Sequence, residues 1–316
     1  MGRFLSPREL AQLLAVRVPF AGAPLPISDR AADPGLFGPE SVTWRMLREP
    51  LLIFAGGRAL LMQAAHPLVA QGAIDHSAYS TDPFGRLMRT FDWTGAVAFG
   101  TRREARAASA LVNRVHSRVT GLLPQQSRTS RVEAGSRYSA LDPELLRWVH
   151  ATFVDTLVVA HDRLVGGLCE DDRNQFVREW DVVGRLMGVP RRLLWKDHAG
   201  LRAYVDRQID DGAVLPGDGS RLVARTIMHP PLPTPLVRPA WDALMFATVG
   251  FLPAPLRSGY RIPWTPAHTA LHESLCLTLR TTRMTMPRRL RVAPIYDFAM
   301  ARAGGELAAG RPRRAA

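Results

Sequence analysis

Signals that begin helices recur along this chain, and they constrain its fold more than any other feature. Residues that favour helix N-caps stand at Ser6, Asp82, Thr101 and Asp142, and proline follows three of them. Proline suits the first helical position because its missing N–H would have no partner there. Apolar residues then recur at helical spacing, and no stretch alternates apolar and polar residues over a useful length. The sequence predicts an all-α fold.

The expected organisation is one large helical domain over residues 1–301, followed by a disordered basic tail over residues 302–316. Five prolines between Pro230 and Pro239 predict a rigid connector, and the polar residues 124–140 predict an excursion without helical periodicity. The helices that we expect cover residues 7–16, 41–48, 51–65, 67–76, 83–98, 101–122, 143–165, 171–187, 197–209, 241–250, 265–281 and 287–301.

Cysteine use and hydropathy limit the class of protein. Cys169 and Cys276 are the two cysteines, and neither belongs to a CxxC or CxxCH motif. This pattern argues against a zinc ribbon, an iron–sulfur cluster and covalent c-type haem. The first twenty residues lack the form of a signal peptide, and no run of 18 uncharged apolar residues occurs. We therefore expect a cytoplasmic protein.

The charge balance is strongly basic. The formal net charge is +13, from 41 basic and 28 acidic residues, and Lys196 is the single lysine. The arginines are spread along the chain, and no basic motif interleaved with aromatic residues is present, so nucleic acid is not an expected partner. A weak attraction to anionic membrane surfaces is the alternative that we retain. The sequence does not indicate an oligomeric state.

Histidines are the best candidates for chemistry. The chain has nine, but it contains neither an HExxH motif nor the ExxH pair of di-iron bundles, and no GxSxG motif is present. A closed zinc site, a di-iron site and a serine hydrolase are therefore not indicated. A single neutral imidazole on a helix suits haem iron, which needs one strong protein ligand.

Residues 54–121, together with two segments farther along the chain, carry a set of motifs whose combination is specific. The sequence Gly56-Gly57-Arg58-Ala59-Leu60-Leu61-Met62-Gln63 leads into Ala65-His66-Pro67. Further motifs are His76-Ser77, Arg86-Leu87-x-x-Thr90, Phe99-Gly100, Val115-His116, Tyr138-Ser139-Ala140-x-Asp142-Pro143 and Trp148-Val149-His150-Ala151-Thr152. Together they resemble the MpaB-type and rubber-oxygenase (latex clearing protein) family over most of residues 40–260.

This resemblance implies a non-covalent haem b within an all-α fold. In rubber oxygenases a histidine on a long helix is the proximal iron ligand, and it follows an Arg-x-x-Lys-Thr motif by some thirty residues. By position the ligand is His116, and the motif corresponds to Arg86, Arg89 and Thr90. The structural alternative is that His116 is a core histidine on an apolar helix face.

Two departures from the family pattern bear on activity. Arg89 replaces the motif lysine, and arginine cannot ligate iron because its guanidinium stays protonated. The rubber enzymes also carry a glutamate, proposed as the catalytic base, about sixteen residues before the motif arginine. Here that neighbourhood is Val69-Ala70-Gln71-Gly72, and the nearest acid is Asp75. Cleavage of polyisoprene by that mechanism is therefore not expected to carry over directly.

Three further residues are candidates with open alternatives. His66 is either a distal or substrate-pocket residue or a structural residue at a helix break. His76 either contacts the cofactor or ends a helix, and Arg58 either reaches a haem propionate or pairs with a carboxylate. His150 and His161 lie three turns apart on one helix face, which favours a role in helix packing.

The function expected from the resemblance is a haem-dependent oxygenase or oxidase that uses O2 on an apolar, isoprenoid-like small molecule. His116 holds the iron in this interpretation, with Arg58, Arg86 and His76 as cofactor contacts and His66, Arg86, Arg89 and Thr90 at the distal side. Two alternatives stay open. One is a haem protein without oxygenase turnover, which acts as a sensor, carrier or peroxidase-like protein. The other is a haem-free helical binding protein.

Overall fold

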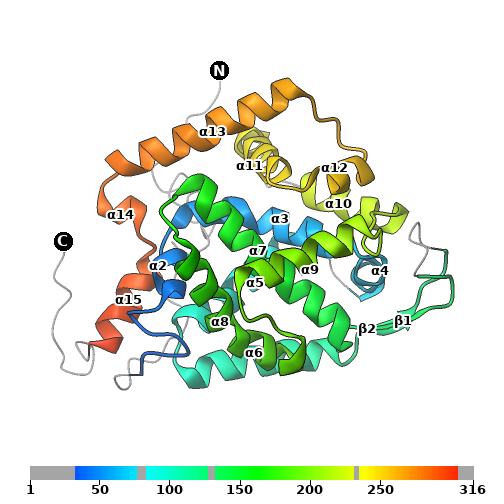
Figure 1. Cartoon of the computed structure of the whole chain (residues 1–316), viewed down its shortest axis with the longest axis horizontal. Helices are drawn as coiled ribbons and strands as arrows, with labels where there is room; N and C mark the ends of the chain where they lie inside the picture. The colour runs from blue at the N-terminus through cyan, green and yellow to red at the C-terminus, as the bar shows by residue number, and fades with distance from the viewer. Residues whose placement is uncertain (1–32, 77–82, 127–131, 231–234, 305–316) are drawn as a thin grey trace. The chain divides into compact units, whose positions relative to one another are not determined.

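The computed structural model describes residues 33–76, 83–126, 132–230 and 235–304. Within these ranges the chain forms fourteen α-helices, three short 3-10 turns and one pair of three-residue strands, which confirms the all-α prediction (Figure 1). The described chain divides into two compact units. Among the described residues, unit 1 comprises residues 33–50, 87–108 and 287–304, and unit 2 comprises the described parts of residues 51–86 and 109–286. The expectation of a single domain over residues 1–301 stays a prediction.

Unit 1 packs around three aromatic side chains. Trp44 lies on α2 (Val42–Leu47), Phe99 ends α5 (Pro83–Phe99), and Tyr296 lies on α15 (Pro294–Ala303). Their ring centroids are 5.7–6.2 Å apart. The Trp44 indole N–H donates to Ala98 O at 2.7 Å, which satisfies its polar atom within the core. The short helix α14 (Arg288–Arg291) precedes α15, and the first half of α6 (Arg102–His116) completes the unit.

Unit 2 is a helical assembly built on α3 (Ile53–Ala64), which packs against α7 (Pro143–Leu164), α11 (Arg238–Gly250) and α10 (Asp218–Met228). Figure 1 shows α3 in blue beside α7 in green. The other elements of the unit are α4 (Pro67–His76), β1 (Thr120–Leu122), β2 (Arg137–Ser139), α8 (Glu170–Met187), α9 (His198–Asp210), α12 (Ala254–Gly259) and α13 (Pro266–Thr285), with 3-10 turns at Pro50–Leu52, Arg191–Leu193 and Pro235–Val237.

Local sequence explains several helix ends. Asp142 caps α7, since its side chain accepts hydrogen bonds from Glu144 N and Leu145 N at 2.8 and 3.3 Å. Gly188 ends α8 at φ 108°, a left-handed conformation that glycine adopts without steric cost. Both boundaries were expected from the sequence. The expected helix at residues 7–16 lies outside the described residues, as does Asp82.

Other boundaries were wrong. The helix expected to reach residue 122 ends at His116, because residues 120–122 pair with residues 137–139 as an antiparallel hairpin. The helix expected over residues 287–301 is two helices, and the second one continues to Ala303 with Arg302 fully buried, so the tail does not begin at residue 302. Helices α10 and α12 were not expected. Pro239 lies in the first turn of α11 rather than in a connector.

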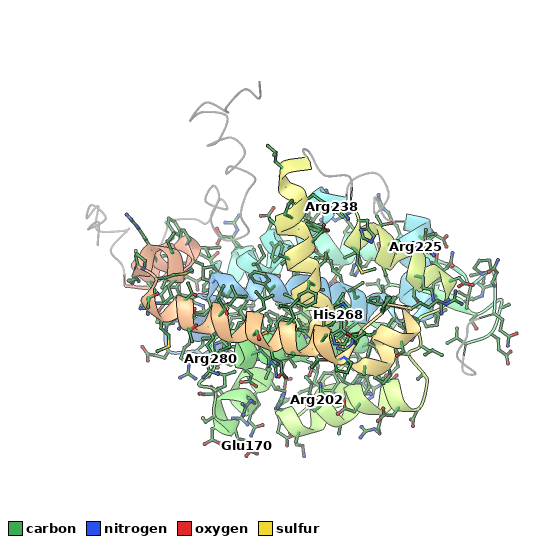
Figure 2. All side chains as sticks on the ribbon, turned by 90° about the horizontal axis from the view of Figure 1, so that it is seen from above. Glu170, Arg202, Arg225, Arg238, His268 and Arg280 are labelled. Carbon is green, nitrogen blue, oxygen red and sulfur yellow. The ribbon has the colours of Figure 1, made fainter. Side chains whose placement is uncertain are left out.

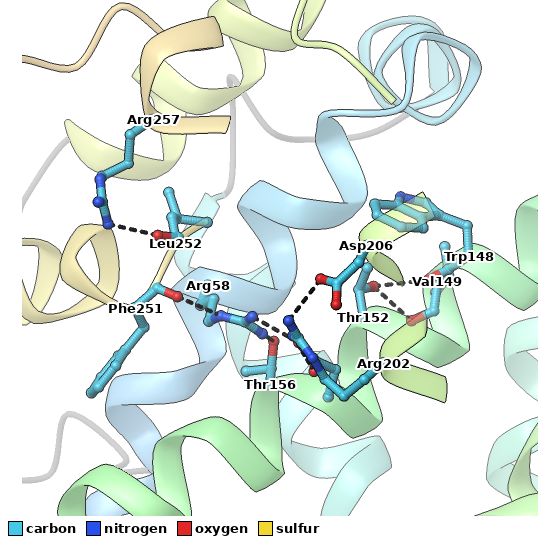
Figure 3. A network of polar contacts seen from close by, with 11 residues as sticks. Arg58, Trp148, Val149, Thr152, Thr156, Arg202, Asp206, Phe251, Leu252 and Arg257 are labelled. Carbon is cyan, nitrogen blue, oxygen red and sulfur yellow. Dashed lines mark hydrogen bonds and ion pairs between the residues drawn. The ribbon is translucent and has the colours of Figure 1, made fainter. Parts of the chain in front are cut away.

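A buried ion pair joins four helices of unit 2 (Figure 3). Arg58 on α3 is 1% exposed, and its guanidinium donates to Asp155 Oδ2 at 2.7 Å, Thr156 Oγ1 at 2.6 Å and Phe251 O at 2.8 Å. Arg202 on α9 donates to Asp155 Oδ1 at 2.8 Å. Burial alone would raise the pKa of Asp155, but the two guanidinium groups offset that effect and hold the pKa below its usual value.

We predict that Asp155→Ala lowers the free energy of unfolding by about 3–5 kcal/mol, because it leaves the buried Arg58 charge without a partner. Asp206→Ala is the matched control. Asp206 also binds Arg202, at 2.7 Å, but it is half exposed, and its loss should cost less than about 1 kcal/mol. Urea unfolding at neutral pH measures both changes. Equal costs would show that burial of the pair contributes little.

Candidate functional site

The helix α6 carries the predicted iron ligand at its last residue. It begins with a reciprocal cap, since Thr101 Oγ1 accepts from Glu104 N at 3.2 Å and Glu104 Oε2 accepts from Thr101 N at 2.8 Å. Asn113 Nδ2 donates to Leu186 O at 2.8 Å and fixes the second half of α6 against α8. His116, one turn later, is half-buried, and its Nδ1 is shielded from solvent.

The surface beside His116 is apolar and basic. Leu111 and Val115 lie on the last turns of α6 with 58% and 56% of their surface exposed, and Leu122 follows on β1 at 53%. Arg114 and Arg118 are exposed on the same segment. Leu111, Val115 and Leu122 are the exposed large aliphatic residues of the segment that carries His116.

His66 lies at the corner where the chain turns by 103° between the segments 50–64 and 67–76. Its Nδ1 accepts a hydrogen bond from Leu68 N at 3.2 Å. Burial lowers the pKa of His66 to about 4, although the nearby Asp142 carboxylate partly opposes this shift. The ring is therefore neutral near pH 7. With Nδ1 acting as acceptor, the single proton lies on Nε2, so His66 presents an N–H donor rather than a lone pair for iron.

His76 lies at the other end of α4, about 15 Å along the helix from His66. Its Nε2 lies 2.9 Å from Thr120 O, and its ring packs edge-on against Tyr138. With that nitrogen as donor, His76 links α4 to the hairpin. The structure thus shows a structural use for His76, and its cofactor role stays a prediction.

Asp75, the acid nearest to the missing family glutamate, is already engaged. Its Oδ2 accepts from the Tyr138 hydroxyl at 2.5 Å and its Oδ1 accepts from Gln71 Nε2 at 2.8 Å. Burial and this hydrogen bond raise the pKa of Tyr138. The Tyr138 ring lies so close to Gly121 that a Cβ there would come within 2.5 Å of its hydroxyl oxygen. The sequence analysis did not predict that Tyr138 binds Asp75. The available signal was Gly121, because a residue without a side chain leaves room for the Tyr138 ring.

The arginine candidates have different surroundings. Arg58 is the buried ion-pair partner of Asp155. Its expected contact with a haem propionate stays a prediction. Arg89 is exposed and Thr90 is half-buried on α5, and Thr90 O accepts from Thr94 Oγ1 at 2.8 Å. Arg86 lies on the same helix, but its side chain is outside the described part of the chain.

Two other histidines have packing roles. His150 is 2% exposed and stacks on Trp195 with ring centroids 6.3 Å apart, and burial lowers its pKa to about 4. His272 lies against Phe251 at 4.8 Å and so close to Gly250 that a Cβ there would overlap its ring. Helix packing was the interpretation favoured for His150. The close approach of His272 to α11 was not anticipated.

Comparison with known proteins now assigns the family. The family described as ER-bound oxygenase mpaB/B′/Rubber oxygenase, catalytic domain, matches residues 44–281, and the chain belongs to it. Two relatives are the uncharacterized protein Mb2261 of Mycobacterium bovis and the uncharacterized protein Rv2237 of Mycobacterium tuberculosis. Each is 26% identical over 238 residues, which cover 73% of this chain and 88% of the relative. No solved structure matches the chain.

The donor set of unit 2 is compatible with haem. Among the described residues, no three side chains of His, Cys, Asp or Glu gather as a metal site made only of protein ligands would require. Haem needs only one axial imidazole, because the porphyrin supplies four nitrogen ligands. His116 offers an imidazole on a well-anchored helix, and His66 offers a neutral N–H donor. These residues fit the cofactor that the family resemblance implies.

We predict that His66 titrates near pH 4, well below the usual value of about 6.5. As the pH falls, the unfolded chain takes up this proton first. The free energy of unfolding therefore declines between about pH 6.5 and pH 4 through this residue. NMR of the imidazole resonances, assigned with His66→Gln, measures the pKa. Titration of His66 near pH 6.5 would contradict the assigned surroundings.

Proposed function

We propose that this protein is a haem-b-dependent oxygenase that acts on an apolar small molecule. The observation that carries the proposal is the match to the oxygenase catalytic domain over residues 44–281, which includes every predicted site residue. When bound, haem b supplies the redox chemistry that activates O2. The chain's own residues bind the cofactor, orient it and provide polar groups near it.

The described surroundings of the histidines support the proposed roles. His116 would hold the iron, since its imidazole is half-buried at the end of a helix that Asn113 fixes against α8. His66 would donate its Nε2 proton in a hydrogen bond, because Leu68 N–H occupies Nδ1. The contacts proposed for Arg86, Arg89 and Thr90 with propionates and with the distal side come from the family resemblance alone.

The exposed residues of α6 and β1 support the proposed class of substrate. Leu111, Val115 and Leu122 expose aliphatic carbon on the segment that carries the predicted ligand, which suits an apolar substrate. Arg114 and Arg118 flank them, and this pairing suits weak contact with an anionic membrane surface where such substrates dissolve. No single described helix is long and apolar enough to cross a membrane, and only the bent pair Pro50–Ala64 and Pro67–His76 passes by length and composition.

One observation favours the second candidate, a haem protein without oxygenase turnover. The family glutamate is missing, and Asp75, the nearest acid, is held by Tyr138 and Gln71. Both oxygens of the Asp75 carboxylate are therefore engaged by hydrogen-bond donors. Oxygen consumption with apolar alkenes, measured on haem-loaded protein, separates the candidates. Substrate-dependent uptake supports the oxygenase, and its absence across a panel of terpenoid and fatty alkenes supports the alternative.

We predict that protein purified from haem-supplemented cells shows a Soret band and that acidified butanone extracts the haem completely, since no CxxCH motif attaches it. His116→Ala should lose most of this absorbance because the iron–imidazole bond anchors the cofactor. His150→Ala is the matched control, and it should retain haem because His150 packs on Trp195. Circular dichroism verifies that both variants fold. Full retention in His116→Ala would move the ligand to another residue.

We predict a change in coordination for Arg89→Lys, which restores the family residue. A lysine amine can ligate iron once it is deprotonated, whereas a guanidinium cannot at any accessible pH. The variant should change from a high-spin to a low-spin spectrum as the pH rises, while wild type should not. Arg86→Ala should weaken haem binding without changing the spin state. Identical pH titrations of Arg89→Lys and wild type would show that position 89 does not face the iron.

A further inference from the structure

The helix α13 is buried on one face and exposed on the opposite one. Figure 2 shows this helix in orange, with His268 and Arg280 labelled. His272 and Cys276 are its buried residues, and they pack toward α11 and α7. Thr281 follows His272 by nine residues, or about two and a half turns, and so points to the other side. On that side six residues recur at alternating spacings of three and four, and all six are exposed. They are Ala267, Ala270, Ser274, Leu277, Thr281 and Met284, and we call them the α13 seam.

The α13 seam has no charged residue. Leu277 and Met284 are 63% and 69% exposed. The Thr281 hydroxyl donates to Leu277 O at 2.9 Å, so its polar atom is satisfied within the helix and its methyl group adds to the apolar surface. Helix faces that remain in water usually carry charges, whereas a 3–4 repeat of apolar and small residues is the pattern of a helix–helix contact.

The order of residues in the seam makes it complementary to a reversed copy of itself. In an antiparallel pair centred between Ser274 and Leu277, these two residues face each other across the two-fold axis. Ala270 then faces Thr281, and Ala267 faces Met284. Each contact places a small side chain opposite a larger one, which lets the helices approach closely without overlap. A parallel pair would instead stack Met284 on Met284 and Ala267 on Ala267.

The flanking charges agree with the same arrangement. Glu273 and Arg280 lie seven residues apart on one flank of the seam. In an antiparallel pair the same flanks of the two helices meet, so Glu273 of each copy comes opposite Arg280 of the other, and two ion pairs form. Within one chain Glu273 also lies 3.5 Å from Arg163, but both side chains are exposed and this contact contributes little.

We propose that the α13 seam is the interface of a homodimer in which two α13 helices pack antiparallel. A second copy of this chain fits the seam better than a lipid surface does, because the flank carries one acid and one base in self-complementary positions. A single helix pair buries less area than most stable interfaces, so the dimer should dissociate in the micromolar range.

Sedimentation equilibrium of the full chain over a hundredfold range of concentration tests the interface. Leu277→Asp should raise the dissociation constant by at least about tenfold, because it buries an unpaired charge at the centre of the seam. Leu222→Asp is the matched control. Leu222 on α10 is 52% exposed and lies outside the seam, so its substitution should leave the dissociation constant unchanged.

A charge exchange tests the orientation. Glu273→Arg and Arg280→Glu should each weaken the dimer, because like charges then face each other, and the double variant should restore the wild-type dissociation constant. A parallel pair cannot give this rescue. A monomer at every concentration, a dimer insensitive to Leu277→Asp, or binding to anionic vesicles that Leu277→Asp abolishes would each overturn the proposal. Haem content is independent of all these outcomes.

Discussion

The buried contact between Arg58 and Asp155 is the interaction on which unit 2 depends. It joins α3 to α7 through a charge pair, to α9 through Arg202 and to the end of α11 through Phe251 O. An ion pair of this kind does not need to add stability compared with an apolar core, but it tolerates very few alternative arrangements. The pair thereby sets the register of α3 against α7, and α3 ends at the corner that carries His66.

Helices and their caps were predictable because they depend on local chemistry. Three or four neighbouring residues are enough to predict the capping roles of Asp142, Thr101 and Gly188. Each of these residues has the predicted contact or conformation. The hairpin was not predictable, because three-residue strands leave no periodicity and depend on pairing across the fourteen residues 123–136. Helix α10 was missed for a related reason, since glycine and aspartate at its start also suit a turn.

For the candidate site, too, the residues could be selected from the sequence but their surroundings could not be predicted. Sequence motifs and the resemblance selected His66, His76, His116 and the arginines, and their roles in a site stay predictions. The surroundings of each side chain depend on contacts between distant segments. Thr120 meets His76, and Tyr138 meets Asp75 from 63 residues away. Such contacts decide which imidazole nitrogen carries a proton and which acid is engaged, and a sequence motif contains neither fact.

The hydrogen bond from Leu68 N–H to His66 has a consequence for how His66 would respond to its environment. A backbone amide does not titrate, and proline at position 67 has no N–H that could compete for the same nitrogen. The tautomer of His66 is thus imposed by the covalent course of the chain at the corner instead of by a neighbouring acid. The Nε2–H group therefore remains a hydrogen-bond donor when the ionic strength changes or when a nearby group gains or loses charge.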